Sequence, residues 1–479
     1  MRQFSVFLFL LAALAAGGPT ADIRAQDQSS RPDSLASKFS MVDFDVEVGP
    51  VSFEDADGGE ENYLSSVFLP SFSRGMWTCG ARLKLRLNGS GFRSEDYDSF
   101  ADILSIARFV QYGAQAPREE AGQNLYGRFG ELEEVRLGYG QLISEYRNTV
   151  SFDNPTIGIE GSRSFKNTLF SGMYSSITSP GIFGMRGAYW PYQTDASSRL
   201  REMVVGMTIA GDLSTEGRLV NPDAAGVPYV AEDSFQNPLV GIGPGRSGGV
   251  LLMASVDAGL PLHVEQLDEL LVYSSLSKIM GFGSGLSLGL NGRTRKGDVQ
   301  MAGWLEARVS GKQYLPNYFN ALYELERAEG ASIDLGEGTT LPAFQTKRNK
   351  LAGQDDTLLG TFIAFEASVR GRYRLRTSFD ETWNKASAGW FHIDFRLRDR
   401  ALPYEVRFMF DRINVGGVKD IWSGDSKDGF LRIDFAHVVW KNVLLGFRFR
   451  QSFEPVERLG RIVGHAKQTR IGPNFGIRL

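Results

Sequence analysis

Residues 361–379 read TFIAFEASVRGRYRLRTSF, and their alternation of apolar and charged residues decides the fold. Side chains of a β-strand point alternately to its two faces, so this stretch has one apolar face and one charged face. The apolar parity holds Ile363, Phe365, Val369, Tyr373, Leu375 and Phe379. The charged parity holds Glu366, Arg370, Arg372, Arg374 and Arg376.

The same split returns in four later stretches, each with apolar residues opposite charged ones. Their charged parities hold Asp394, Arg396 and Arg398, then Glu405, Arg407 and Asp411, then Arg432 and Asp434, and finally Arg448 and Arg450. A soluble sandwich turns its apolar face to a core, whereas a membrane barrel turns it to lipid and encloses the charges in a wet lumen. Because both folds alternate, the two ends of the chain must decide between them.

The N-terminus has the pattern of a secretory signal. Arg2 precedes a short apolar run, Phe4 to Ala16, which is too short to span a bilayer as a helix. We expect residues 1–25 to be a signal peptide cleaved after Ala25. Beyond them no long apolar run remains, so the chain is predicted to be an exported protein without a helical membrane span.

Composition and strand spacing predict an all-β fold. The chain has 55 glycines and 12% aromatic residues, which suits strands joined by turns. We predict a single large antiparallel transmembrane β-barrel of roughly 16–20 strands, with a short helix near residues 96–111. Residues 26–78 are expected to form an N-terminal periplasmic or plug segment. Residues 79–479 are expected to form the barrel, with long loops at 212–249 and 326–356.

The C-terminus carries a family resemblance. Ile471, Phe475, Ile477 and Leu479 alternate with small and polar residues, which resembles the terminal signal of Gram-negative outer-membrane barrels read by the barrel-assembly machinery. Two departures are Leu479 in place of an aromatic residue and Pro473 within the strand. The stretches 137–148 and 314–327 are also similar to patterns in large porin-like barrels of uncharacterised function. The resemblance implies a barrel in the cell outer membrane, in contact with its lipid, and it carries over no functional residue.

Motifs for catalysis and metal binding are weak. Gly245-Arg246-Ser247-Gly248-Gly249 has the letters of a nucleophile elbow, but that motif needs a strand before it and a helix after it. The four histidines are scattered, and the single Cys79 has no partner for a disulfide. With a formal charge of −4 and interspersed acids and bases, a nucleic-acid surface is not expected. We therefore expect no catalytic residue, metal or cofactor, and no enzyme activity.

The charged parity is the candidate functional surface. Its fifteen residues are ten arginines and five acids, and all are predicted to line the lumen. We favour a wall in which each acid pairs with an arginine on the next strand, and the alternative is a positively biased channel. The predicted function is a channel or transporter for small polar solutes, with anion bias as the sharper alternative. A structural or secretion-related barrel that displays its loops is the second hypothesis, and a lipid hydrolase using Ser247 is the weakest.

Overall fold

The structure is a computed structural model. It describes residues 40–54, 60–113, 125–149, 155–193, 200–215, 231–232, 238–241, 249–264, 267–334, 340–370, 372–384, 389–399, 401–416, 421, 429–441, 443–458 and 461–478. The predicted signal peptide, 1–25, and Ser247 lie outside these residues. Among the described residues, no helix is long and apolar enough to cross a bilayer.

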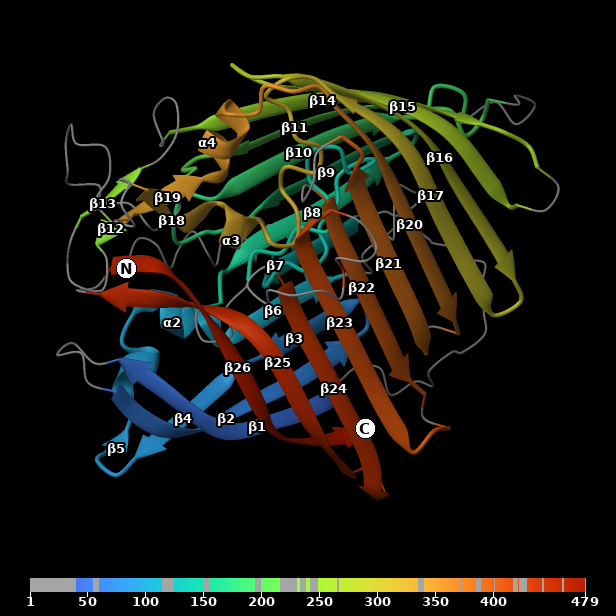
Figure 1. Ribbon diagram of the computed structural model, residues 1–479. Coiled ribbons are helices and arrows are strands. Elements are labelled where there is room, and N and C mark those ends of the chain that lie inside the picture. Colours follow the sequence, from blue (N-terminus) through green and yellow to red (C-terminus); the bar gives the residue numbers. More distant parts are fainter. Residues whose placement is uncertain are drawn as a thin grey trace. The chain divides into compact units, whose positions relative to one another are not determined.

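The described chain forms a closed antiparallel barrel with twenty wall positions. Each strand pairs with its neighbour along the chain, and β26 pairs back onto β1 to close the wall (Figure 1). Two wall positions are each shared by two short strands. The first is shared by β3 and β4, which both pair with β2. The second is shared by β5, which pairs with β4, and β6, which pairs with β3. The wall strands are β1 (Ser40–Glu54), β2 (Glu60–Arg74), β3 (Trp77–Ala81), β4 (Leu83–Asn88), β5 (Gly91–Phe92), β6 (Ala107–Tyr112), β7 (Leu125–Gly130), β8 (Gly158–Phe165), β9 (Thr168–Tyr174), β10 (Ile182–Tyr189), β11 (Val204–Asp212), β14 (Leu251–Pro261), β15 (Glu269–Ile279), β16 (Ser284–Lys296), β17 (Val299–Ser310), β20 (Leu358–Val369), β21 (Tyr373–Thr382), β22 (Gly389–Arg398), β23 (Tyr404–Val415), β24 (Gly429–Trp440), β25 (Val443–Arg458) and β26 (Arg461–Arg478).

The two faces of the wall differ as the alternation predicts. On β16 the apolar side chains of Leu286, Leu288 and Leu290 are about half exposed, whereas Ser287 and Asn291 are buried. The apolar face therefore lies outside, where it meets no second sheet of the described chain, and the polar face lies inside. This arrangement excludes the soluble sandwich and is the architecture of outer-membrane barrels.

The stretch 361–379 lies in two strands, β20 and β21, and the turn between them includes Arg370 and Arg372, whose amide donates to the Val369 carbonyl at 2.9 Å. The register keeps the predicted parity, because Ile363 lies opposite Phe379 and Glu366 opposite Arg376. Arg370 is the exception. It occupies the turn with a positive φ of 53°, is 59% exposed and pairs with Asp298, so it does not line the lumen.

The predicted helix near 96–111 is shorter than its spacing suggests. The segment contains a 3-10 turn, η1 (Ser94–Tyr97), and a helix, α2 (Phe100–Ser105), which begins at a capping box formed by Ser99 and Asp102. From Ala107 onward the chain is strand β6. The prediction of helix from Ala107 to Gln111 was wrong. The spacing of the apolar residues there also fits a strand, and pairing with β3 and β7 stabilises the strand.

The prediction of a periplasmic or plug segment at 26–78 needs correction in its described part. β1 and β2 form a long hairpin of the wall, and β1 also pairs with β26. Because barrel closure needs a partner for the last strand, the first strands are part of the wall.

The two predicted long loops are joined in a separate small sheet. Its strands are β12 (Ala231–Glu232), β13 (Pro238–Gly241), β18 (Ala328–Asp334) and β19 (Thr340–Thr346), and two helices flank the second loop, α3 (Tyr323–Glu326) and α4 (Lys347–Ala352). β13 of the first loop pairs in parallel with β19 of the second. Both loops leave the same end of the barrel, which we call the loop end, and we call the opposite end the short-turn end (Figure 1).

Candidate functional site: a charged lumen crossed by two inward segments

Two connections of the described chain fold into the barrel instead of outward. The first inward segment, 131–149, follows β7, and the second inward segment, 311–327, follows β17. They pair with each other through a parallel bridge between Ile143 and Phe319. The Ser144 amide also donates to the Phe319 carbonyl at 3.1 Å, and the Asn317 amide donates to the Gln141 carbonyl at 2.9 Å. The lumen is therefore crossed by polypeptide.

An apolar core holds the two segments together. Ile143, Tyr146, Phe319 and Tyr323 are fully buried, and Leu351 of α4 packs into the same cluster. Phe319 and Tyr323 meet edge to face, with their ring centroids 4.9 Å apart. Irregular segments rarely bury so much apolar surface unless they are fixed in place, so this core makes the crossing a permanent part of the lumen.

Charged and polar groups tether the first inward segment to the wall. Glu134 accepts from Arg396 at 2.9 Å and from Arg376 at 3.0 Å, and it lies 3.4 Å from Arg374. Further along the segment, Arg147 pairs with Asp411 at 2.6 Å. One carboxylate thus serves three arginines from two neighbouring strands.

Asp411 is also held from the wall. His392 lies on the neighbouring strand, directly opposite, and its Nδ1 is 2.6 Å from an oxygen of Asp411. Both side chains are fully buried. His392 therefore supports the carboxylate that binds Arg147, which is a structural role.

The strand register places several arginines directly opposite one another. Arg374, Arg396 and Arg407 follow one another across β21, β22 and β23. A second row, across β24, β25 and β26, is formed by three arginines: Arg432, Arg450 and Arg470. Like charges directly opposite in a sheet are destabilising, so these rows are not explained by wall stability.

Acids on neighbouring strands balance only part of this charge. Arg376 lies opposite Asp394, Arg398 opposite Glu405, and Asp434 lies between Arg407 and Arg448. The favoured wall of acid–arginine pairs across neighbouring strands therefore exists in places and is interrupted by the two arginine rows.

Other acids that face these arginines lie outside the C-terminal strands on which the predicted lumen residues stand. From the first inward segment, Glu133 lies near Arg407, Arg128 and Arg396. Burial alone would raise the pKa of Glu133, but these guanidinium groups lower it to about 2. The pKa of Glu134 is likewise held well below its usual range by the surrounding arginines, against the effect of burial. Both carboxylates are therefore ionised at neutral pH.

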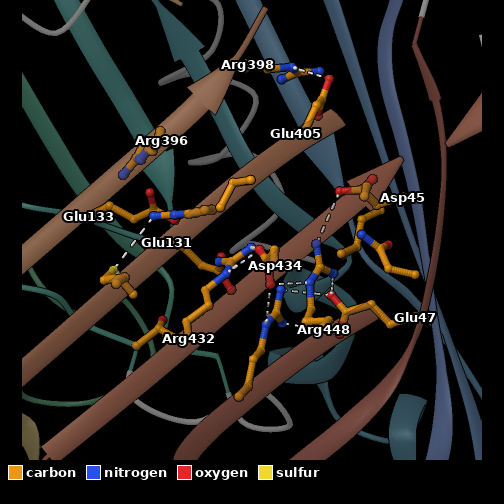
Figure 2. Close-up of a pocket in the computed structure, with 18 of the residues that line it drawn as sticks. Asp45, Glu47, Glu131, Glu133, Arg396, Arg398, Glu405, Arg432, Asp434 and Arg448 are labelled. Atoms are coloured by element: carbon orange, nitrogen blue, oxygen red, sulfur yellow. Dashed lines mark hydrogen bonds and ion pairs between the residues drawn. The ribbon is translucent and has the colours of Figure 1, made fainter. Parts of the chain in front are cut away.

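Strand β1 supplies two more acids at the closing seam. Figure 2 shows Arg448 between Asp45, Glu47 and Asp434, with an ion pair to each. Glu47 also lies 3.1 Å from Arg450. β1 thus carries the counter-charges for arginines on β25, with β26 between the two strands.

Together these groups line a cavity of about 560 Å³. We call it the arginine cavity, because twelve arginines and seven acids of the described chain line it. Ten of the fifteen predicted lumen residues border it: Arg372, Arg374, Arg396, Arg398, Glu405, Arg407, Arg432, Asp434, Arg448 and Arg450. Glu366, Arg376, Asp394 and Asp411 lie on the inner wall in ion pairs beside it, and Arg370 is in the turn.

A second cavity of about 360 Å³ lies against other wall strands, β11 and β15 to β17, and also borders the first inward segment. Tyr139 of that segment lines it and stacks on Tyr273 of β15, with ring centroids 3.8 Å apart. Trp190 and Trp304 complete its aromatic lining, and Arg136 adds a positive charge. The first inward segment thus contributes residues to two cavities of different chemistry.

Sequence reasoning missed the acids of the first inward segment. Glu131, Glu133 and Glu134 stand in the run Gly130-Glu131-Leu132-Glu133-Glu134, which has no strand alternation. That run of acids directly after a glycine was the available signal. It could not reveal the arginine partners of Glu134, because they lie more than 200 residues away.

Comparisons with known proteins add little to this picture. The sequence matches no family model and no curated protein. Among solved structures, the copper transporter OprC aligns over 92% of this chain and 80% of its own, with 8% identity and a TM-score of 0.32. OccK9 (OpdG) from Pseudomonas aeruginosa aligns over 93% and 100%, with 9% identity and a TM-score of 0.30. A BenF-like porin from Pseudomonas fluorescens aligns over 92% and 98%, with 8% identity and a TM-score of 0.29. Values this low transfer nothing to this chain, and its fold rests on its own strand pairing.

Proposed function

We propose that this protein is an outer-membrane channel for small anionic solutes, which pass through the arginine cavity. The outer-membrane location is supported by the closed wall with its exposed apolar outer face, since outer-membrane barrels turn apolar side chains to lipid.

The observation that carries the proposal is the pair of arginine rows. Placing Arg374, Arg396 and Arg407 opposite one another costs stability, and the same holds for the second row. Such a cost is expected where a functional group must remain available, as in pores lined by rings of one charge. With twelve arginines against seven acids, the cavity keeps a positive excess that concentrates anions.

The inward segments define the kind of channel. Because they cross the lumen and are anchored by a buried core, the path is narrower than the open lumen of a twenty-stranded barrel. This favours selection of small solutes over free diffusion. A cavity of about 560 Å³ is the size of a site for one small molecule.

Planar-bilayer recording tests the proposal. The purified protein is inserted between KCl solutions of different concentration, and the reversal potential gives the ratio of chloride to potassium permeability. We expect a ratio above one. A barrel that inserts but never conducts, or one that prefers potassium, contradicts the proposal.

A further inference from the structure

The ladder that closes the barrel is far shorter than the strands it joins. β1 has 15 residues and β26 has 18, but they pair only from Asp43–Arg478 to Glu47–Asn474. Each strand continues toward the loop end paired to its other neighbour, β1 with β2 and β26 with β25. In the described register, no residue of β1 beyond Glu47 pairs with β26. In Figure 1 the two hairpins, blue and red, meet near the C-terminus and separate toward their far ends.

The paired part is too short to cross the hydrocarbon layer. A transmembrane strand needs ~9–11 residues, and the ladder provides only the five at the short-turn end. The part of β1 and β26 that lacks this pairing therefore lies at the depth of the hydrocarbon layer. Other short ladders, such as that of β6 with β7, join strands that are themselves short. Only at β1 and β26, among the described strands, are two long strands paired over so small a part of their length.

Prolines stand at the point where the ladder stops. Pro473 follows the last paired residue of β26, Asn474, toward the loop end, and Pro50 lies three residues beyond Glu47 on β1. Proline has no amide hydrogen, so it cannot extend a ladder and protects a strand edge from pairing. The sequence itself therefore ends the seam.

The arginine cavity reaches this seam from inside. Asp45, Glu47, Arg470 and Asn474, all on the two seam strands, line it. Asn474 is 5% exposed, and its Oδ1 has no hydrogen-bond partner among the described residues. On the outer face of the same strand, Phe475 and Ile471 are 44% and 65% exposed. At this seam only β1 and β26 separate the positively charged arginine cavity from the apolar outer surface, and these two strands are paired over only part of their length.

Backbone groups of a strand edge cannot face hydrocarbon without a polar partner, unless they line a wet cavity. Here the wet cavity is rich in arginine. A molecule with an anionic headgroup and an acyl chain fits both sides, because the headgroup meets the arginines and the chain remains in the lipid.

We propose that the seam between β1 and β26 is a lateral access route and binding site for anionic lipids and similar acyl-chain anions. The headgroup occupies the arginine cavity beside Arg448, Arg450 and Arg470, and the acyl chain leaves between the strands on the loop-end side of Ile471, because the Val48 carbonyl still lies against Gly472 and the Ile471 carbonyl against Gly49. This inference rests on the cavity of the proposed channel but does not require that the channel conducts.

Photo-crosslinking in lipid vesicles tests the route. The photoreactive residue p-benzoylphenylalanine replaces Val67, which lines the cavity on β2, next to the seam strand β1. The matched control is Met409, which lines the same cavity from β23. Phe475, on the outer face, reports ordinary lipid contact. The vesicles contain equal amounts of phosphatidylethanolamine and phosphatidylglycerol, and mass spectrometry identifies the lipid joined to each position.

We expect lipid adducts at positions 67 and 475 but not at 409. At position 67 the anionic lipid should exceed the zwitterionic one by about fivefold, the ratio for ~1 kcal/mol of electrostatic preference. Heat-modifiable gel migration verifies folding, and Leu69, another cavity residue of β2, replaces Val67 if that variant does not fold. No adduct at 67 when 475 is labelled, equal labelling at 67 and 409, or no headgroup preference would each overturn the proposal. Failure of the channel proposal shows separately, as absence of current.

Discussion

Replacing Glu134 with glutamine should increase the preference for anions. The side chain keeps its size and its capacity to accept hydrogen bonds, but the negative charge shared by Arg374, Arg376 and Arg396 is lost. For an anion held about 4 Å from that charge, the lost repulsion in water is ~1 kcal/mol. A change of that size corresponds to about fivefold in local concentration, and so in the ratio of chloride to potassium permeability.

The assay is the reversal potential in a KCl gradient, measured for Glu134→Gln and for a matched control. Asp298→Asn is suitable, because it also removes a carboxylate paired with an arginine, in an exposed turn outside the lumen. The control should leave the permeability ratio unchanged. If Glu134→Gln lowers the anion preference, or if both variants shift the ratio equally, the assignment of Glu134 to the ion path is wrong.

Three other predictions use the same recordings. Arg407→Gln should lower the anion preference by about the same factor, whereas Arg370→Gln in the turn should have no effect, and equal effects would contradict the placement of the arginine rows. Phe319→Ala should remove ~3–5 kcal/mol from the core that joins the inward segments and give larger, noisier currents, whereas Phe165→Ala on the outer face should not. The folded-state pKa of Glu133, about 2, lies below its ordinary value of 4.5, so its stabilising interactions are complete above about pH 4.5 and are lost as the pH falls through 2. Because the carboxyl remains ionised in the folded channel until the pH approaches 2, Glu133 should leave the anion preference unchanged from pH 7 through about 4.5 and raise it only as the pH nears 2, and a rise near neutral pH would contradict this.

The fold could be predicted largely from alternation. Two-residue periodicity on β20 to β25 requires an apolar and a polar face, and the structure keeps that parity along most of these strands. Leu397 of β22 is an exception, because it is 8% exposed and lines the arginine cavity. The predicted strand number, 16–20, includes the observed twenty. Alternation gives no information about register with distant strands, and for that reason β1 and β2 were not recognised as wall.

The sequence predicts the arginines of the C-terminal strands but not the acids of the first inward segment that bind them. The arginines of the wall are visible in the sequence because each lies on a strand of obvious parity. Their partners Glu133 and Glu134 lie on an irregular segment, and no local pattern shows that it folds inward. The stretches 137–148 and 314–327 resemble porin-like sequences, yet their mutual pairing through Ile143 and Phe319 depends on tertiary contacts.

The parallel pairing of β13 with β19 makes two distant loops a single unit of the barrel surface. Peptide tags and deletions are usually designed one loop at a time, as if each loop could vary alone. Here, shortening 212–249 would leave β19 with an exposed edge, and that edge could recruit a strand from another molecule. A tag or deletion in either loop therefore has to be designed with both strands, β13 and β19, in view.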